Sequence, residues 1–243
     1  MVKHSDQREG LMGIARRTTL LSAVLAGGAL LAGPAQAAAY DAVSDFSVTS
    51  NPGSVWSYGY SNGVFPAYSL ALFDKPTATA TYLSWTDASY IVFGTPVAWL
   101  YLSGSAINGV LPGQMALHPG PLYRAYAILR FTAPSTAAYN VVGQFYAGDS
   151  GAMNGSVVHN SNLSTPLAYF SNTTDASTFS FSALHLVAGE TLDLAVGNNG
   201  DYSSGSTPVT MTITTAVPEP ATLALMLGGL GVVGWVAWRR KRA

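Results

Sequence analysis

Two uncharged apolar segments, residues 20–32 and 221–238, flank a middle region in which apolar and polar residues alternate. The alternation is clear in 191–196 (TLDLAV) and in 209–214 (VTMTIT), and it predicts β-strands that bury one face. Gly, Asn and Pro interrupt the region at short intervals, as turns between strands do. We therefore predict an all-β fold: a single antiparallel β-sandwich or jelly roll, flanked by an N-terminal signal peptide and a C-terminal transmembrane helix. Further predicted strands are 97–103, 126–132, 139–147, 155–159 and 178–184.

The N-terminal segment has the three parts of a secretory signal peptide. Arg16 and Arg17 precede the apolar stretch 20–32, which is short for a membrane span. The small residues Ala35 and Ala37 then provide a site for signal peptidase. We predict a signal peptide over 1–37. Cleavage two residues later, within the same alanine run, and a permanent N-terminal anchor are the alternatives.

The C-terminal segment reads as an anchor. Val217-Pro218-Glu219-Pro220 precedes 221–238, eighteen residues without a charge. A helix of that length spans about 27 Å, close to the bilayer core of about 30 Å. The basic cluster Arg239-Arg240-Lys241-Arg242 would stop transfer and keep that end in the cytoplasm. We predict that 217–243 holds the chain transiently in the inner membrane.

The order of Pro-Glu-Pro, short apolar span and terminal basic cluster resembles the PEP-CTERM sorting signal. The resemblance implies an exosortase-type membrane protease that recognises Val217-Pro218-Glu219-Pro220 and removes the span. It implies a protein that ends at the cell surface or in a biofilm matrix, together with exopolysaccharide. A permanent single-span anchor is the alternative.

Charge is distributed unevenly along the chain. The middle region, 38–216, holds three basic and nine acidic residues and so carries a net charge of −6, whereas the whole chain carries −1. An acidic domain with so few cations cannot neutralise a run of phosphates, which excludes nucleic acid as a partner. The absence of cysteine excludes disulfides, thiolate nucleophiles and cysteine metal sites.

The ectodomain over 38–216 contains a set of short motifs: Trp56–Tyr60, Leu117–Gly120, Ala127–Pro134, Gly148-Asp149, Leu186–Gly197 and Asn198–Tyr202. By these motifs, the segment Leu117–Thr214, together with Trp56–Tyr60, resembles a β-sandwich module of PEP-CTERM and planctomycete surface proteins. The module resembles carbohydrate-binding modules more than any enzyme.

Alternating aromatic residues suggest where a glycan would bind. Trp56, Tyr58 and Tyr60 would share one strand face, as would Trp99 and Tyr101. Aromatic faces stack on sugar rings, although a sandwich also buries aromatic residues in its core. The predicted glycan contacts are Trp56, Tyr58, Tyr60, Trp99, Tyr101 and His118.

Candidate catalytic and metal-binding residues are few. Gly148-Asp149-Ser150-Gly151 resembles the serine motif of trypsin-like proteases, but His118, the histidine upstream of it, stands in a predicted turn. We therefore predict no catalytic residues and no cofactor. Structural calcium, held by Asp149 and Asp201 in Gly-rich loops, is an alternative. Arg130 lies inside an apolar strand and needs either a carboxylate partner or solvent.

The sequence thus predicts an exported, non-catalytic surface or matrix protein whose ectodomain binds extracellular polysaccharide. A purely structural matrix protein without a ligand site is the alternative, and a glycan-active hydrolase is a third, weaker one.

Overall fold

The computed structural model describes residues 37–62, 67–90, 94–121, 125–215 and 221–242. Ala37–Ala216 form a compact unit of their own. Residues 1–36 of the predicted signal peptide, including Ala35, and the motif Val217–Pro220 lie outside the described residues.

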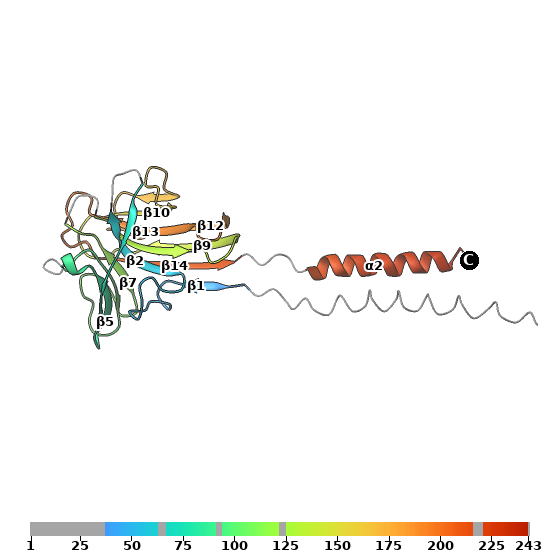
Figure 1. Cartoon of the computed structure of the whole chain (residues 1–243), viewed down its shortest axis with the longest axis horizontal. Helices are drawn as coiled ribbons and strands as arrows, with labels where there is room; N and C mark the ends of the chain where they lie inside the picture. The colour runs from blue at the N-terminus through green and yellow to red at the C-terminus, as the bar shows by residue number, and fades with distance from the viewer. Residues whose placement is uncertain (1–36, 63–66, 91–93, 122–124, 216–220, 243) are drawn as a thin grey trace, which may run out of the picture. The chain divides into compact units, whose positions relative to one another are not determined.

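Two antiparallel sheets make up the compact unit (Figure 1). The first has the strand order β12-β9-β14-β7-β6-β5-β4. Strand β1 pairs the C-terminal half of β14, whereas β7 pairs the N-terminal end of β14. Its strands are β1 (Ala39–Asp41), β4 (Lys75–Ala78), β5 (Tyr82–Thr86), β6 (Val97–Tyr101), β7 (Met115–His118), β9 (Ala137–Phe145), β12 (Ser177–Leu186) and β14 (Thr207–Thr215). A 3₁₀ turn, η1 (Ala88–Tyr90), follows β5.

The second sheet has the order β11-β10-β13-β8-β2-β3. Its strands are β2 (Trp56–Asn62), β3 (Ser69–Leu72), β8 (Ala127–Thr132), β10 (Asn154–His159), β11 (Ala168–Phe170) and β13 (Thr191–Gly197). All the strand pairs of this sheet are antiparallel.

The main core lies between the two sheets and follows the predicted alternation. Leu192 and Leu194 of β13 belong to the same buried cluster as Met211 and Ile213 of β14, and all four side chains are fully buried. Because the two strands belong to different sheets, the cluster joins the sheets face to face. The predicted β-sandwich is confirmed at this level.

A smaller apolar cluster covers the outer face of the second sheet. Ile128, Val158 and Ala195 point away from the main core and are buried beneath Tyr68. The second sheet is therefore covered on part of both faces. This is why six of the seven residues of β13 are buried although its sequence alternates, and why the consecutive residues Ala127, Ile128 and Leu129 of β8 are all buried.

One turn prediction was wrong. Leu117-His118-Pro119-Gly120 was expected to be a turn, but Leu117 and His118 end strand β7, where they pair with β6 and Leu117 also pairs with β14. Pro119, which lacks a backbone N–H, then ends the strand.

The C-terminal helix α2 (Ala221–Arg240) forms where the sequence predicts a helix. Its last turn is basic, which suits the negative end of the helix dipole, and Arg239 lies over the Trp235 ring at 4.7 Å. Among the described residues, however, no helix is both long enough and apolar enough to cross a membrane. The predicted transmembrane helix is therefore not confirmed.

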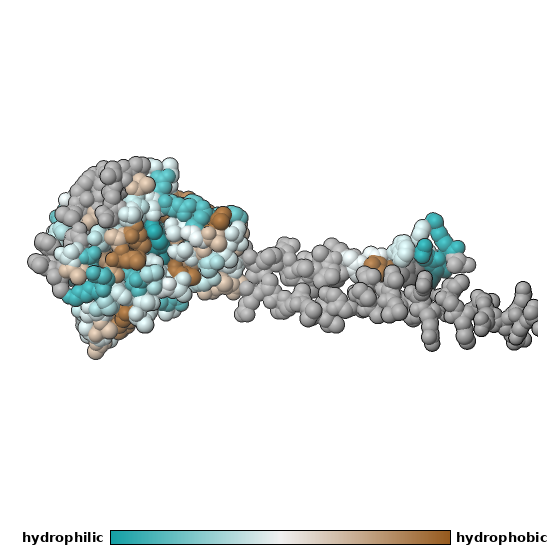
Figure 2. Space-filling view, in the orientation of Figure 1, coloured by the Kyte–Doolittle hydropathy of each residue, from teal (hydrophilic) through white to brown (hydrophobic). Residues whose placement is uncertain are grey.

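The visible face of the sandwich is mostly pale or hydrophilic, with small, separate hydrophobic patches (Figure 2). Isolated patches of this kind are ordinary on protein surfaces. This visible face therefore shows no large, continuous hydrophobic patch of the kind that binds another protein.

Candidate functional site

The predicted aromatic stripe on β2 faces the core. Trp56 and Tyr58 are 3% and 2% exposed, and Tyr60 is half-buried against the same core. The Trp56 ring packs on Phe131 at 5.4 Å between centroids. The prediction that the ring faces of Trp56 and Tyr58 stack on a glycan is therefore wrong, because β2 lies within a sheet whose apolar face is buried by the other sheet.

Trp56 and Tyr58 nevertheless belong to the lining of a surface cleft of about 180 Å³. Its lining residues are Asp45, Ser47, Ser50, Gly53, Ser54, Trp56 and Tyr58. The Trp56 indole Nε1–H donates to Asp45 Oδ2 at 3.0 Å. The Tyr58 ring packs on Phe46 at 4.8 Å, and its hydroxyl lies beside the Ser47 backbone without reaching good hydrogen-bond geometry.

Burial raises the pKa of Tyr58, and the charge of Asp45 adds a smaller effect in the same direction, whereas the Ser47 backbone opposes it. The Tyr58 hydroxyl therefore keeps its proton at neutral pH. Asp45, in contrast, is exposed and supplies a carboxylate.

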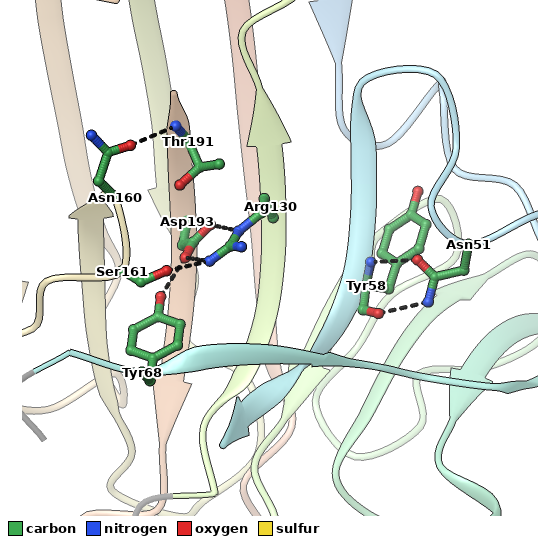
Figure 3. Close-up of polar contacts among 8 residues, drawn as sticks. All are labelled: Asn51, Tyr58, Tyr68, Arg130, Asn160, Ser161, Thr191 and Asp193. Carbon is green, nitrogen blue, oxygen red and sulfur yellow. Dashed lines mark hydrogen bonds and ion pairs between the residues drawn. The ribbon is translucent and has the colours of Figure 1, made fainter. Parts of the chain in front are cut away.

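The segment that forms the cleft wall is fastened to the sandwich at several points. Asn51 Nδ2 donates to the Tyr58 carbonyl at 2.6 Å, and Asn51 Oδ1 accepts from Tyr58 N–H at 2.9 Å (Figure 3). Asn51 Nδ2 also donates to the Phe73 carbonyl at 2.8 Å. Trp85 Nε1–H donates to the Ser47 carbonyl at 2.7 Å, and Gly53 N–H donates to the Trp56 carbonyl at 2.8 Å. The cleft is thus a fixed feature of the fold and does not depend on a free loop.

A second polar group lies on the outer face of the second sheet. Asp193 of β13 is fully buried, and its two carboxylate oxygens accept from Arg130 Nε and Nη2, each at 2.7 Å (Figure 3). The Tyr68 hydroxyl also donates to Asp193. Burial first, and then the charge of Asp193, raises the pKa of Tyr68, so that hydroxyl stays protonated. Of the two environments predicted for Arg130, the carboxylate partner is confirmed.

The same group fastens two loops to the sheet. Arg130 Nη2 donates to Ser161 Oγ at 2.5 Å, and Ser161 adopts a positive φ of 60°. Asn160 and Thr191 exchange two hydrogen bonds, at 2.9 and 3.0 Å, and Tyr68 N–H donates to the Ser161 carbonyl at 3.3 Å. All charges and hydroxyls of the group are paired within the chain, which indicates a structural role.

His118 is also occupied within the chain. Its Nδ1 lies 2.9 Å from the Pro119 carbonyl, and its Nε2 lies 3.2 Å from the Gly205 N–H. The pair of contacts fixes a neutral ring, with Nδ1 as donor and Nε2 as acceptor. The predicted glycan contact at His118 is wrong, since neither nitrogen is left for a ligand, and the same contacts prevent His118 from acting as a base for Ser150.

Trp99 and Tyr101 lie on the outer face of the first sheet. Tyr101 is 2% exposed and its hydroxyl donates to the Ser105 carbonyl at 2.5 Å, so it cannot stack on a glycan. Trp99 is half-buried, with its ring centroid 6.0 Å from that of Tyr101. A glycan contact at Trp99 stays a prediction.

Asp149 and Asp201 each accept a local backbone hydrogen bond, from Ser150 and Ser203 at 2.8 and 2.9 Å. In the part of the chain that the structure describes, no three His, Cys, Asp or Glu side chains gather as a metal site would require. Calcium binding stays an untested prediction.

The comparison with known families concerns the C-terminal end. Residues 216–242 match the PEP-CTERM protein-sorting motif. The PEP-CTERM match covers the predicted motif Val217–Pro220, helix α2 and the basic cluster Arg239–Arg242. A PEP-CTERM motif implies a surface protein that an exosortase recognises. No curated protein sequence matches the chain.

The comparison with solved structures finds similar chains of low identity, among them the following three. A Podospora anserina GH26-CBM35 β-(1,4)-mannanase is 16% identical over 49% of this chain and 25% of that chain, with a TM-score of 0.31. A family 35 carbohydrate-binding module from Clostridium thermocellum is 22% identical over 47% and 90%, with a TM-score of 0.27. Pika GITRL is 11% identical over 38% and 79%, with a TM-score of 0.28.

The cleft residues Asp45, Ser47, Ser50 and Ser54 were not predicted from the sequence. They stand in a Ser- and Asn-rich stretch that reads as an ordinary loop. The single signal was a carboxylate upstream of an aromatic strand, and nothing in the sequence shows that Asp45 closes on Trp56.

Proposed function

We propose that the chain is an exported, exosortase-processed surface or matrix protein whose β-sandwich binds extracellular polysaccharide without catalysis. The PEP-CTERM match over 216–242 carries the sorting part of the proposal. Signal peptidase would act first, transient anchoring in the inner membrane would follow, and an exosortase would then cleave at the PEP-CTERM motif.

Strand β1 supports one of the two signal-peptide cleavage sites. Ala38 N–H donates to Thr215 Oγ1, and Thr215 N–H donates to the Ala38 carbonyl, both at 2.9 Å. Cleavage after Ala37 keeps these bonds, whereas cleavage after Ala39 removes them together with the first residue of β1. We therefore expect Ala38 at the mature N-terminus.

Intact mass and N-terminal sequencing of the surface form test this processing. The expected form begins at Ala38 and lacks Ala221–Ala243. A variant with Pro218 and Glu219 both changed to Ala should keep its tail and accumulate in the membrane fraction. Recovery of the full tail on the wild-type surface protein would contradict the sorting proposal.

The polar cleft beside Trp56 and Tyr58 supports carbohydrate binding, because exposed serine hydroxyls and a carboxylate at a fixed cleft suit a polyhydroxylated ligand. Among its lining residues, Asp45 is the only carboxylate, whereas glycoside hydrolysis ordinarily needs two. This supports a non-catalytic role. With net gains of about 1 kcal/mol per hydrogen bond, a single domain would bind in the millimolar range, and many copies on a surface would raise the avidity.

A purely structural matrix protein is the second candidate, and the burial of Trp56 and Tyr58 favours it. Retention of residues 37–216 on the host's immobilised exopolysaccharide separates the two, because this unit contains the whole sandwich and its core. Retardation relative to an uncoated column is expected for a binding protein. No retardation would favour the scaffold.

A further inference from the structure

We propose that the cleft lined by Asp45, Ser47, Ser50, Gly53, Ser54, Trp56 and Tyr58 binds one neutral sugar residue of the polysaccharide. The inference rests on the proposed carbohydrate-binding function and names its site and the class of its ligand. In this proposal, hydrogen bonds in the cleft take the place of the stacking on exposed aromatic rings that the sequence predicted.

The cleft is built before any ligand arrives. Its wall is held by the Asn51 amide on the backbone of β2, by Trp85 on the Ser47 carbonyl and by Trp56 on Asp45. Ligand binding therefore does not have to order this segment, which matters for a weak ligand. The volume of about 180 Å³ is smaller than the 300–1,000 Å³ typical of sites for larger ligands, and it suits a single ring.

The donors and acceptors of the cleft match sugar hydroxyls. Both described hydrogen bonds to Asp45, from Trp56 Nε1–H and Asp41 N–H, use Oδ2, so Oδ1 can accept from a ligand. Ser50 and Ser54 are exposed hydroxyls that both donate and accept.

The charge of the cleft selects against acidic sugars. Asp45 is a carboxylate at the cleft, and Asp41, which donates its N–H to Asp45, carries a second one. Hydrogen bonds from Val43 and Ser44 N–H and from the Thr212 hydroxyl outweigh the effect of burial and lower the pKa of Asp41, so it stays ionised. A uronate in the cleft would meet the like charge of Asp45, with Asp41 next to it, whereas a neutral sugar gains a charge-assisted hydrogen bond.

The Trp56 indole N–H reports on the cleft directly, because it donates to Asp45. Proton–nitrogen spectra of residues 37–216 would be recorded with D-glucose, D-galactose, D-mannose and D-xylose, and separately with D-glucuronate and with Ca²⁺. Trp56→Phe assigns the signal. At least one neutral sugar should shift it, with a dissociation constant on the order of millimolar.

Two variants locate the site. Asp45→Asn should weaken sugar binding about tenfold or more, and Ser54→Ala about two- to tenfold. Asp175→Asn, the same change at an exposed acid in the loop before β12, should leave it unchanged. Ser54 is exposed, so Ser54→Ala keeps the test valid even if Asp45→Asn perturbs the fold.

The outcomes separate the two levels of the proposal. Equal sugar binding by Asp45→Asn, Ser54→Ala and wild type would overturn the cleft assignment and leave carbohydrate binding standing. A Trp56 shift with D-glucuronate or Ca²⁺ alone would overturn the neutral-sugar assignment. No binding of any sugar and no retention on the native exopolysaccharide would overturn the proposed function itself.

Discussion

Two carboxylates of the sandwich, Asp193 and Asp45, show how differently the fold uses the same chemical group. Asp193 is fully buried, and Arg130 and Tyr68 bind both of its oxygens. Asp45 is exposed at a cleft, and Trp56 and Asp41 bind one of its oxygens. A carboxylate whose bonds are all internal holds structure together, whereas one with an unused oxygen at a fixed cleft can take a ligand.

The largest effect is expected at Asp193. Asp193→Asn keeps the side-chain size but leaves the Arg130 charge partly buried without a counter-ion, which should destabilise residues 37–216 by about 3 kcal/mol or more. Urea unfolding with an unchanged slope measures the loss.

The double variant Arg130→Met/Asp193→Leu removes both charges and is the control. The double variant should lose less unfolding free energy than Asp193→Asn alone, because no charge is left unpaired. If Asp193→Asn lowers the free energy of unfolding by less than about 1 kcal/mol, the Arg130–Asp193 pair does not stabilise the fold as a buried ion pair would.

His118 is a second, partly buried group whose polar atoms all have partners within the chain, because both of its ring nitrogens make hydrogen bonds there. Burial lowers the pKa of His118 below its ordinary 6.5, although the Pro119 carbonyl and the charge of Asp149 oppose this. Below pH 6.5 the unfolded chain therefore binds a proton that the folded chain resists, so stability should fall as the pH drops from 7 toward 5.

Unfolding free energies across this pH range, compared with those of His118→Gln, isolate the contribution. The variant should lose part of the pH dependence, and His185→Gln, at an exposed histidine, should not. Identical pH profiles for wild type and His118→Gln would show that the His118 ring is not held neutral.

The smallest effect is expected at Asp45. Asp45→Asn keeps an acceptor oxygen for the Trp56 indole, so its stability cost should not exceed about 1 kcal/mol. Its effect should fall on ligand binding instead. A loss of stability as large as that of Asp193→Asn would remove the contrast between the two carboxylates and make Asp45 a structural residue.

The sequence alone determined the features that depend on local pattern. The alternation in 191–196 and 209–214 placed β13 and β14 and their buried faces, because side chains alternate across any strand. The C-terminal sorting motif is likewise local, since its three features are consecutive in the chain. The need of Arg130 for a partner also followed from its apolar strand.

Only the tertiary structure decided which residues meet. Arg130 and Asp193 are 63 residues apart, and strand pairing of β8 with β13 brings them together. Trp56 and Tyr58 alternate as an exposed stripe would, yet the opposite sheet covers their faces, and both residues line the cleft together with Asp45. Period-two alternation specifies two faces of a strand, but which face is buried depends on what packs against it, and that is a property of the whole fold.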